Sequence, residues 1–86
     1  MSAVATNSYA LGVMLRQLRE QRGLTQAEVA ERSGVSRQLV VKIEKGHPRA
    51  EIGKVLAVVR ALGGGLAVEP IAVTPPTIDL DDLLEG

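Results

Sequence analysis

The sequence contains no cysteine, tryptophan or phenylalanine, and Tyr9 is its one aromatic residue. Without cysteine the chain can form neither a disulfide nor a thiolate metal site. The one histidine, His47, precedes a proline and has no second histidine or cysteine to share a metal ion, so we expect a loop residue there. No segment approaches the roughly 20 consecutive apolar residues that a membrane-spanning helix needs.

These absences also argue against an enzyme. The 86 residues offer no Ser-His-Asp, Cys-His or metal-binding constellation and leave little room for a closed pocket. The three glycines at 63–65 are no phosphate-binding loop, because they follow a helical pattern and no Lys-Ser or Lys-Thr comes after them. We therefore expect no catalytic residue, no metal and no cofactor. No secretory signal is expected either, so a cytoplasmic, nucleoid-associated protein of bacterial type is the default.

The charge of the chain is unevenly distributed, although its net value is zero. All ten basic residues lie between Arg16 and Arg60. Residues 1–60 also contain five acidic residues and carry a net charge of +5, whereas residues 61–86 contain five acidic residues and no basic one. A basic body with an acidic end predicts two surfaces for two different partners.

The first regular element is a helix predicted over residues 9–22, after a small, polar segment 1–8 that we interpret as a flexible arm. Its apolar residues recur at helical spacing: Leu11, Met14, Leu15 and Leu18. Asn7 or Ser8 can cap its start, and Gly23 can end it in a left-handed conformation.

Two short helices separated by a turn follow within residues 23–46, GLTQAEVAERSGVSRQLVVKIEKG. Thr25 lies three residues before Glu28, which is the spacing of a capping box at the start of a helix. Gly34 ends this helix after about two turns, and Ser36 can cap the next one. We expect four residues of the pair to face inward: Val29, Ala30, Val40 and Ile43.

A fourth helix is predicted from residue 51 to residue 62, with Glu51 near its positive end. Its apolar stripe is expected to consist of Ile52, Val55, Leu56, Val59 and Leu62. Val58 lies off that stripe, so the helix has more apolar surface than one small core explains.

Residues 63–70 predict one short strand, formed by Leu66, Ala67, Val68 and Glu69 and stopped by Pro70. A single strand leaves its backbone groups without partners, and pairing with the same strand of a second copy would satisfy them. We therefore expect a homodimer. Residues 71–86 are interpreted as an acidic, disordered tail, although its interspersed leucines leave open an interaction with a partner's basic groove.

The two short helices at 23–46 predict a helix-turn-helix, the unit that lays its second helix in the major groove of DNA. On a helical wheel of residues 36–45, five side chains gather opposite the inward face: Arg37, Gln38, Val41, Lys42 and Lys45. Arginine can bind guanine and glutamine can bind adenine through two hydrogen bonds, and valine can contact a thymine methyl group. Gln26, in the first turn of the preceding helix, can direct its amide and free backbone N–H groups at a phosphate.

The stretch LGVMLRQLREQRGLTQAEVAERSGVSRQLVVKIEKG resembles the Cro/XRE-type helix-turn-helix of phage repressors. The hallmark positions are the LTQAE segment, the Gly34-Val35-Ser36 turn and the closing Ile43-Glu44-Lys45-Gly46. The resemblance covers residues 11–62 and implies an all-α, lambda-repressor-like fold of four helices. The following GHPRAEIGKVLAVVRALG and single strand are most similar to HipB-like antitoxins, the DNA-binding partners of HipA-type kinase toxins.

This resemblance implies a dimer joined by a shared two-stranded sheet, a palindromic operator and autoregulation together with the toxin. The positions that match DNA contacts of the family are Gln26, Ser36, Arg37, Gln38 and Lys42. Arg19 and Glu44 match a buried ion pair with a structural role. Two departures stand out, because three glycines precede the strand and the chain has no tryptophan to anchor a tail in a toxin.

The sequence therefore predicts a sequence-specific, homodimeric repressor of an inverted-repeat operator that also neutralises a HipA-like kinase toxin. Residues 9–62 are expected to form its DNA-binding domain. Two alternatives remain open: a plain XRE-family repressor without a toxin, and a protein-binding adaptor that acts through the acidic tail.

Overall fold

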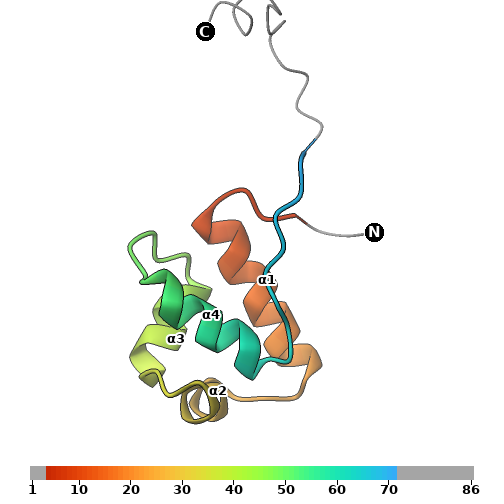
Figure 1. Ribbon diagram of the computed structural model, residues 1–86. Helices are drawn as coiled ribbons and strands as arrows, with labels where there is room; N and C mark the ends of the chain where they lie inside the picture. The colour runs from red at the N-terminus through yellow and green to blue at the C-terminus, as the bar shows by residue number, and fades with distance from the viewer. Residues whose placement is uncertain (1–3, 72–86) are drawn as a thin grey trace, which may run out of the picture.

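The computed structural model describes residues 4–71, which contain four helices and no strand. The helices are α1 (Ser8–Gln21), α2 (Gln26–Ser33), α3 (Arg37–Glu44) and α4 (Ile52–Ala61). In Figure 1, α4 lies in front of α3, α1 lies to the right of α4, and α2 is seen end-on at the bottom. The expected all-helical fold with four helices is confirmed. The acidic tail expected over residues 71–86 lies, apart from Ile71, outside the described residues.

Local side-chain hydrogen bonds explain where the first three helices begin. Asn7 caps α1, because its Oδ1 accepts from the backbone N–H of Ala10 at 2.7 Å. The capping box of α2 is complete: the Thr25 hydroxyl accepts from the Glu28 N–H at 3.1 Å, and the Glu28 carboxylate accepts from the Thr25 N–H at 3.0 Å. That backbone hydrogen bond lowers the pKa of Glu28 below its usual range.

The turn between α2 and α3 depends on Gly34. Its φ of 75° lies in the left-handed region, where a side chain would be strained. Its N–H donates to the carbonyl of Ala30 at 3.0 Å and so closes α2. Two residues later the Ser36 hydroxyl accepts from the Leu39 N–H at 3.1 Å and begins α3. The chain therefore reverses in a very short space and brings two helices of eight residues together.

One hydrophobic core holds all four helices. Its buried residues are Leu15, Val29, Ala30, Val40, Ile43, Val55, Val58, Val59 and Leu62. The four residues of α2 and α3 expected to face inward are all among them. No helix within residues 4–71 is long and apolar enough to cross a membrane.

The apolar stripe expected on α4 is wrong in part. Val58 is only 1% exposed and lies in the core, whereas Ile52 and Leu56 are 63% and 40% exposed. Both stripes have helical spacing and share Val55 and Val59, so they differ only by a rotation about the helix axis. The position of α2, which α4 packs against, decides between them.

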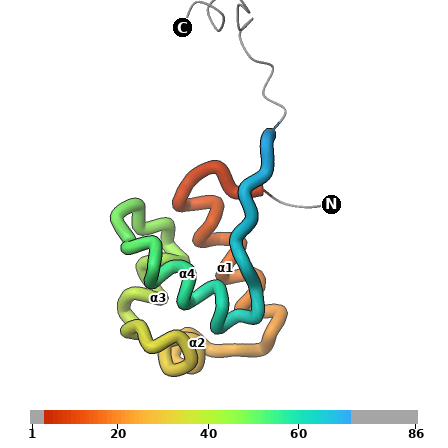
Figure 2. The backbone as a smooth tube through the Cα atoms, viewed as in Figure 1, coloured from red at the N-terminus to blue at the C-terminus, as the bar shows by residue number. Residues whose placement is uncertain are grey.

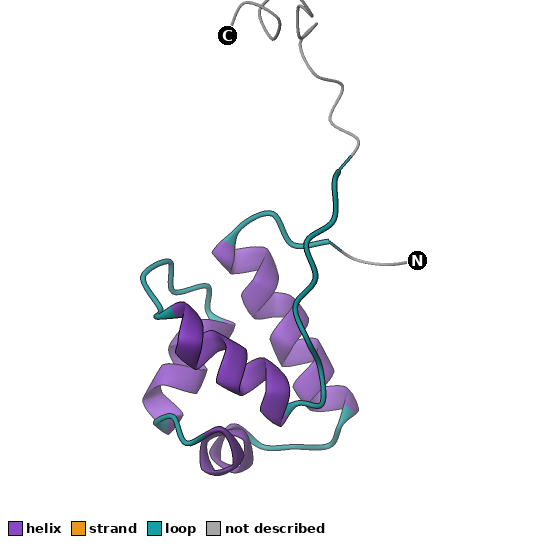
Figure 3. Ribbon diagram, viewed as in Figure 1, coloured by secondary structure: helices purple, strands orange, loops and turns teal. Residues whose placement is uncertain are grey.

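The segment after α4 runs back along α1 toward the start of the chain (Figure 2). Residues 64–71 have no regular secondary structure within the single chain (Figure 3), and the strand expected at 63–70 is absent there. Residues 65–69 border a groove of about 490 Å³ with Val4, Leu11 and Met14. Val68 is fully exposed. The segment therefore exposes apolar side chains without any strand pairing in the described residues.

A close backbone approach fixes the position of α1 on α3. A Cβ atom on Gly12 would lie 2.5 Å from the carbonyl oxygen of Ile43 and 2.7 Å from that of Glu44. Glycine is therefore required here for packing, and the apolar spacing of the helix gave no sign of this requirement.

We expect Gly12→Ala to lower the free energy of unfolding by about 1–3 kcal/mol, because the backbones of α1 and α3 must move apart. Gly53→Ala is the matched control, since the nearest atom to its new Cβ is a flexible Glu51 oxygen at 3.6 Å. That variant should gain at most about 1 kcal/mol from helix propensity. Urea denaturation of both variants measures the difference, and equal stabilities would contradict the packing role of Gly12.

Candidate nucleic-acid interface

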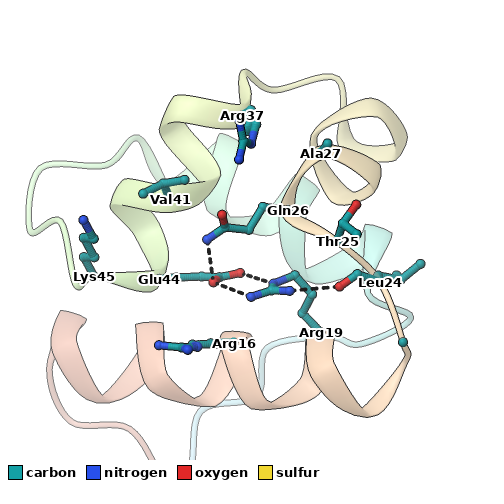
Figure 4. Close-up of a pocket in the computed structure, with 11 residues that line it drawn as sticks. Arg16, Arg19, Leu24, Thr25, Gln26, Ala27, Arg37, Val41, Glu44 and Lys45 are labelled. Carbon is teal, nitrogen blue, oxygen red and sulfur yellow. Dashed lines mark hydrogen bonds and ion pairs between the residues drawn. The ribbon is translucent and has the colours of Figure 1, made fainter.

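A groove of about 530 Å³ lies where α1, the start of α2 and α3 meet (Figure 4). Its lining consists of Arg16, Arg19, Gly23, Leu24, Thr25, Gln26, Ala27, Arg37, Val41, Glu44 and Lys45. Of the residues expected to bind DNA or to form the ion pair, all but Ser36, Gln38 and Lys42 are among them. Within residues 4–71 no group of three or more potential metal ligands comes together.

The floor of the groove is an ion pair between Arg19 of α1 and Glu44 of α3. The Arg19 Nε donates to Glu44 Oε2 at 2.7 Å and its Nη2 donates to Oε1 at 3.1 Å, so the pair is bidentate. The two side chains are only 13% and 6% exposed. The hydrogen bond to Glu44 raises the pKa of Arg19 above its usual value, so the guanidinium remains charged.

Two further hydrogen bonds connect this pair to the start of α2. Arg19 Nη1 donates to the backbone carbonyl of Leu24 at 2.9 Å, and Gln26 Nε2 donates to Glu44 Oε1 at 3.1 Å. Figure 4 shows Arg19 and Gln26 converging on the Glu44 carboxylate from opposite sides. One carboxylate thereby ties together α1, α2 and α3, and no buried side-chain polar atom within residues 4–71 lacks a partner.

The expected base-reading residues lie on the outer face of α3. Arg37, Gln38, Lys42 and Lys45 are exposed, and Val41 is half-buried. Arg37, Val41 and Lys45 follow one another at intervals of four residues and border the groove. Gln38 and Lys42 are exposed on the same helix but do not line the groove. The face thus combines three cations, one amide and one apolar side chain.

Ser36 and Gln26, at the starts of α3 and α2, contribute differently to this surface. Ser36 is exposed, and its hydroxyl oxygen already accepts the Leu39 N–H as the α3 cap. The Gln26 amide nitrogen is engaged by Glu44, which leaves its carbonyl oxygen and the first backbone N–H groups of α2 at the groove. Backbone N–H groups at a helix start carry partial positive charge and favour an anion.

Two features of the groove are absent from the sequence-based prediction. The hydrogen bond from Gln26 to Glu44 gives Gln26 a structural role beside the expected phosphate contact. Arg16 also lines the groove from α1, three residues before Arg19 and therefore on the same side of that helix. The spacing of three residues between Arg16 and Arg19 could have predicted that Arg16 faces the groove, once Arg19 was known to lie there.

The helix-turn-helix family model matches residues 15–68, which is more than half of the chain. The chain belongs to the Cro/XRE-type helix-turn-helix family. The match contains α2, α3, α4 and the second half of α1, and so includes every residue of the groove.

Two relatives agree with this assignment. Over 53 residues the chain is 42% identical to an uncharacterized HTH-type transcriptional regulator, y4mF, of Sinorhizobium fredii, and the match covers 62% of this chain and 70% of the relative. Over 50 residues it is also 42% identical to an uncharacterized HTH-type transcriptional regulator of Methanothermobacter thermautotrophicus. That match covers 58% of this chain and 72% of the relative.

Three solved structures share the fold. The restriction-modification controller protein C.AhdI of Aeromonas hydrophila is 33% identical with a TM-score of 0.59, over 63% of this chain and 82% of that one. The clp gene regulator ClgR of C. glutamicum is 30% identical with a TM-score of 0.65, over 77% of this chain and 85% of that one. HipB, as a variant in complex with the O2 20mer, has a TM-score of 0.76 over 81% of this chain and 97% of the HipB chain. HipB is only 17% identical, so this likeness concerns the fold alone.

We expect Glu44→Ala to lower the free energy of unfolding by about 3–5 kcal/mol, because it leaves the Arg19 charge buried without a partner. Glu20→Ala is the control, since it removes the exposed Arg16–Glu20 pair, whose side chains are 65% and 55% exposed. That change should cost less than about 1 kcal/mol. Chemical denaturation compares the two, and similar losses would contradict the role assigned to Glu44.

Proposed function

We propose that this protein is a sequence-specific, DNA-binding transcriptional repressor. The observation that carries the proposal is the exposed face of α3, where Arg37, Gln38, Val41, Lys42 and Lys45 project from a helix held rigidly by the Arg19–Glu44 pair. Membership in the Cro/XRE-type family and the HTH-type regulators among its relatives support the same function.

The chemistry of this face suits the major groove of DNA. Arg37, in the first turn of α3, and the neighbouring Gln38 carry the side chains that form paired hydrogen bonds with guanine and adenine. Val41, one turn further along, offers an apolar surface to a thymine methyl group. The two lysines extend toward the end of the helix and are assigned to phosphates or base edges.

Phosphate contacts at the rim of the groove would set the orientation of α3. The start of α2 offers its free backbone N–H groups and the side chain of Gln26, and the exposed hydroxyl of Ser36 can donate to a second phosphate. With about four to six phosphates engaged by each copy, binding would weaken steeply as salt concentration rises.

We further propose that two copies assemble by pairing residues 66–69 into a two-stranded sheet. This segment runs away from α4 in an open course (Figure 2), and its backbone has no strand partner within residues 4–71. Leu66 and Val68, two residues apart and 45% and 100% exposed, would project on one face of that sheet. A symmetric dimer would read an inverted repeat with half-site centres about 34–36 Å apart.

Within this function, we propose the more specific role of a HipB-like antitoxin that represses its own operon and neutralises a HipA-like kinase. The support is the extent of the structural likeness, which includes 97% of the HipB chain, and the resemblance of residues 46–63 to that family. Two alternatives compete with this role: a plain repressor without a toxin, and an adaptor that acts through the acidic tail. The pull-down from native cells distinguishes them.

We expect Arg37→Ala to weaken binding to an operator selected from random DNA by about 1–3 kcal/mol, because a paired contact with one base is lost. Binding to unselected DNA should weaken much less. The control is Arg32→Ala, which removes an exposed arginine of α2 that does not line the groove. Fluorescence anisotropy with both DNAs gives the ratio, and equal losses on both would move Arg37 from base recognition to phosphate contact.

A chain that ends at Gly65 should dissociate into monomers at micromolar concentration, because it lacks the proposed strand. It keeps the hydrogen bonds from Gly63 and Gly64 to the last carbonyls of α4. A chain that ends at Val73 is the control, since it loses the acidic tail but retains residues 66–69. Sedimentation equilibrium measures both masses, and a dimer of the shorter chain would remove the shared strand from the proposal.

A pull-down of the full chain at native level from its own cells should recover a HipA-type kinase, identified by mass spectrometry. The same pull-down with the chain ending at Val73 tests whether the acidic tail holds it. Recovery of DNA without a kinase would favour the plain repressor. Recovery of another protein, lost on truncation, with no preference for any DNA sequence would favour the adaptor.

A further inference from the structure

Three arginines gather on a part of the surface that takes no part in the groove. Arg32 of α2 and Arg60 of α4 line one shallow hollow, and Arg32 and Arg22 line a second, with Ala61 common to both. We name Arg22, Arg32 and Arg60 the arginine patch. The two hollows share only Leu24 with the lining of the groove, so the arginine patch and the groove are distinct surfaces.

No acidic side chain neutralises this patch within the described residues. The ion pairs formed in residues 4–71 are Arg16–Glu20 and Arg19–Glu44, and neither hollow has an acidic residue in its lining. Glu28, four residues before Arg32, has its carboxylate held by the backbone N–H of Thr25 at 3.0 Å, and the charge of Arg32 is the smallest of the influences on the pKa of Glu28.

Helix capping accounts for one of the three arginines. The Arg22 Nε donates to the carbonyl of Leu62 at 3.2 Å, so this residue closes the C-terminus of α4. Arg32 and Arg60 lie in the last turns of α2 and α4, where a cation interacts favourably with the helix dipole. That interaction leaves all their guanidinium N–H groups open to an anion, because both side chains are exposed and form no hydrogen bond within residues 4–71.

We propose that the arginine patch binds the acidic end of the same chain, residues 79–85. This stretch carries Asp79, Asp81, Asp82 and Glu85 and contains no basic residue, so its charge is complementary to the patch. The patch lies apart from the proposed DNA-binding face, so this contact does not depend on DNA binding.

The length of the chain allows this contact within one copy. Ile71, where the described chain ends, comes eight positions after Gly63, which lies beside the patch. Asp79 comes eight positions after Ile71, and eight positions span at most about 26–29 Å. A tail that turns back after Ile71 is therefore long enough to bring Asp79, its first carboxylate, to the patch. Docked there, its negative charge is kept away from α3 and from the phosphates that α3 would approach.

A spin label on the full chain tests the proposal directly, because the protein has no native cysteine and Gly86→Cys provides a single attachment point. At low salt the label should selectively broaden the amide resonances of Arg32, Arg60 and Gly63. This broadening should be lost at about 1 M salt, where charges are screened beyond about 3 Å.

Two double variants of the labelled chain distinguish the surfaces. Arg32→Gln with Arg60→Gln should abolish the broadening and leaves the cap formed by Arg22 in place. Lys42→Gln with Lys45→Gln removes the same charge from α3 and should leave the broadening unchanged. A well-dispersed amide spectrum verifies that each variant is folded.

Three results would overturn the proposal. Broadening centred on Arg37 and Lys42 would place the tail on the DNA-binding face. An even or absent effect would mean that the tail docks nowhere on the body. Broadening in a mixture of labelled chain and isotope-enriched unlabelled chain would mean that the tail comes from another copy.

Discussion

The ion pair between Arg19 and Glu44 is the contact on which the geometry of the proposed DNA-binding face depends. Its atoms belong to α1 and α3, and hydrogen bonds to Leu24 and Gln26 add the start of α2. A pair this well buried is stable only when its remaining hydrogen-bonding groups are satisfied, which both additional contacts achieve. The desolvation of the two charges is thus offset only when α1, α2 and α3 are arranged so that all of these hydrogen bonds form. In that arrangement the outer face of α3 is exposed to solvent.

Shape and charge act together around this pair. The short turn at Gly34 and the glycine contact at Gly12 bring α3 close to both α2 and α1, so the helix has little freedom to tilt. A helix held in this way keeps the side chains that we propose to read bases in register with one another, which favours discrimination between DNA sequences over mere attraction to phosphate. The net charge of zero hides an uneven distribution along the sequence. Residues 1–60 carry a net charge of +5, and residues 61–86 carry five acidic residues and no basic one.

Much of the fold could be predicted from the sequence, because its signals are local. Thr25, Glu28, Gly34 and Ser36 act through residues three or four positions away, and the helices begin and end where these signals lie. The face of α4 that packs inward could not be predicted with the same certainty, because Val58 and Leu56 satisfy the helical spacing equally well. The hydrogen bond from Gln26 to Glu44 joins residues 18 positions apart and required the packed structure. The strand expected at residues 63–70 is absent from the described chain, because a short run of apolar residues does not by itself supply a pairing partner.

The most direct test of the central claim is an NMR titration of the full chain with its selected operator, beside a scrambled duplex of the same composition. Large, saturable shifts are expected at the start of α2 and along the outer face of α3. The Arg19 Nε–H resonance should stay in place, because the buried pair is retained. A response to both duplexes that is equal in size, or one centred on α4 and residues 64–71, would contradict the assignment of α3 as the DNA-reading element.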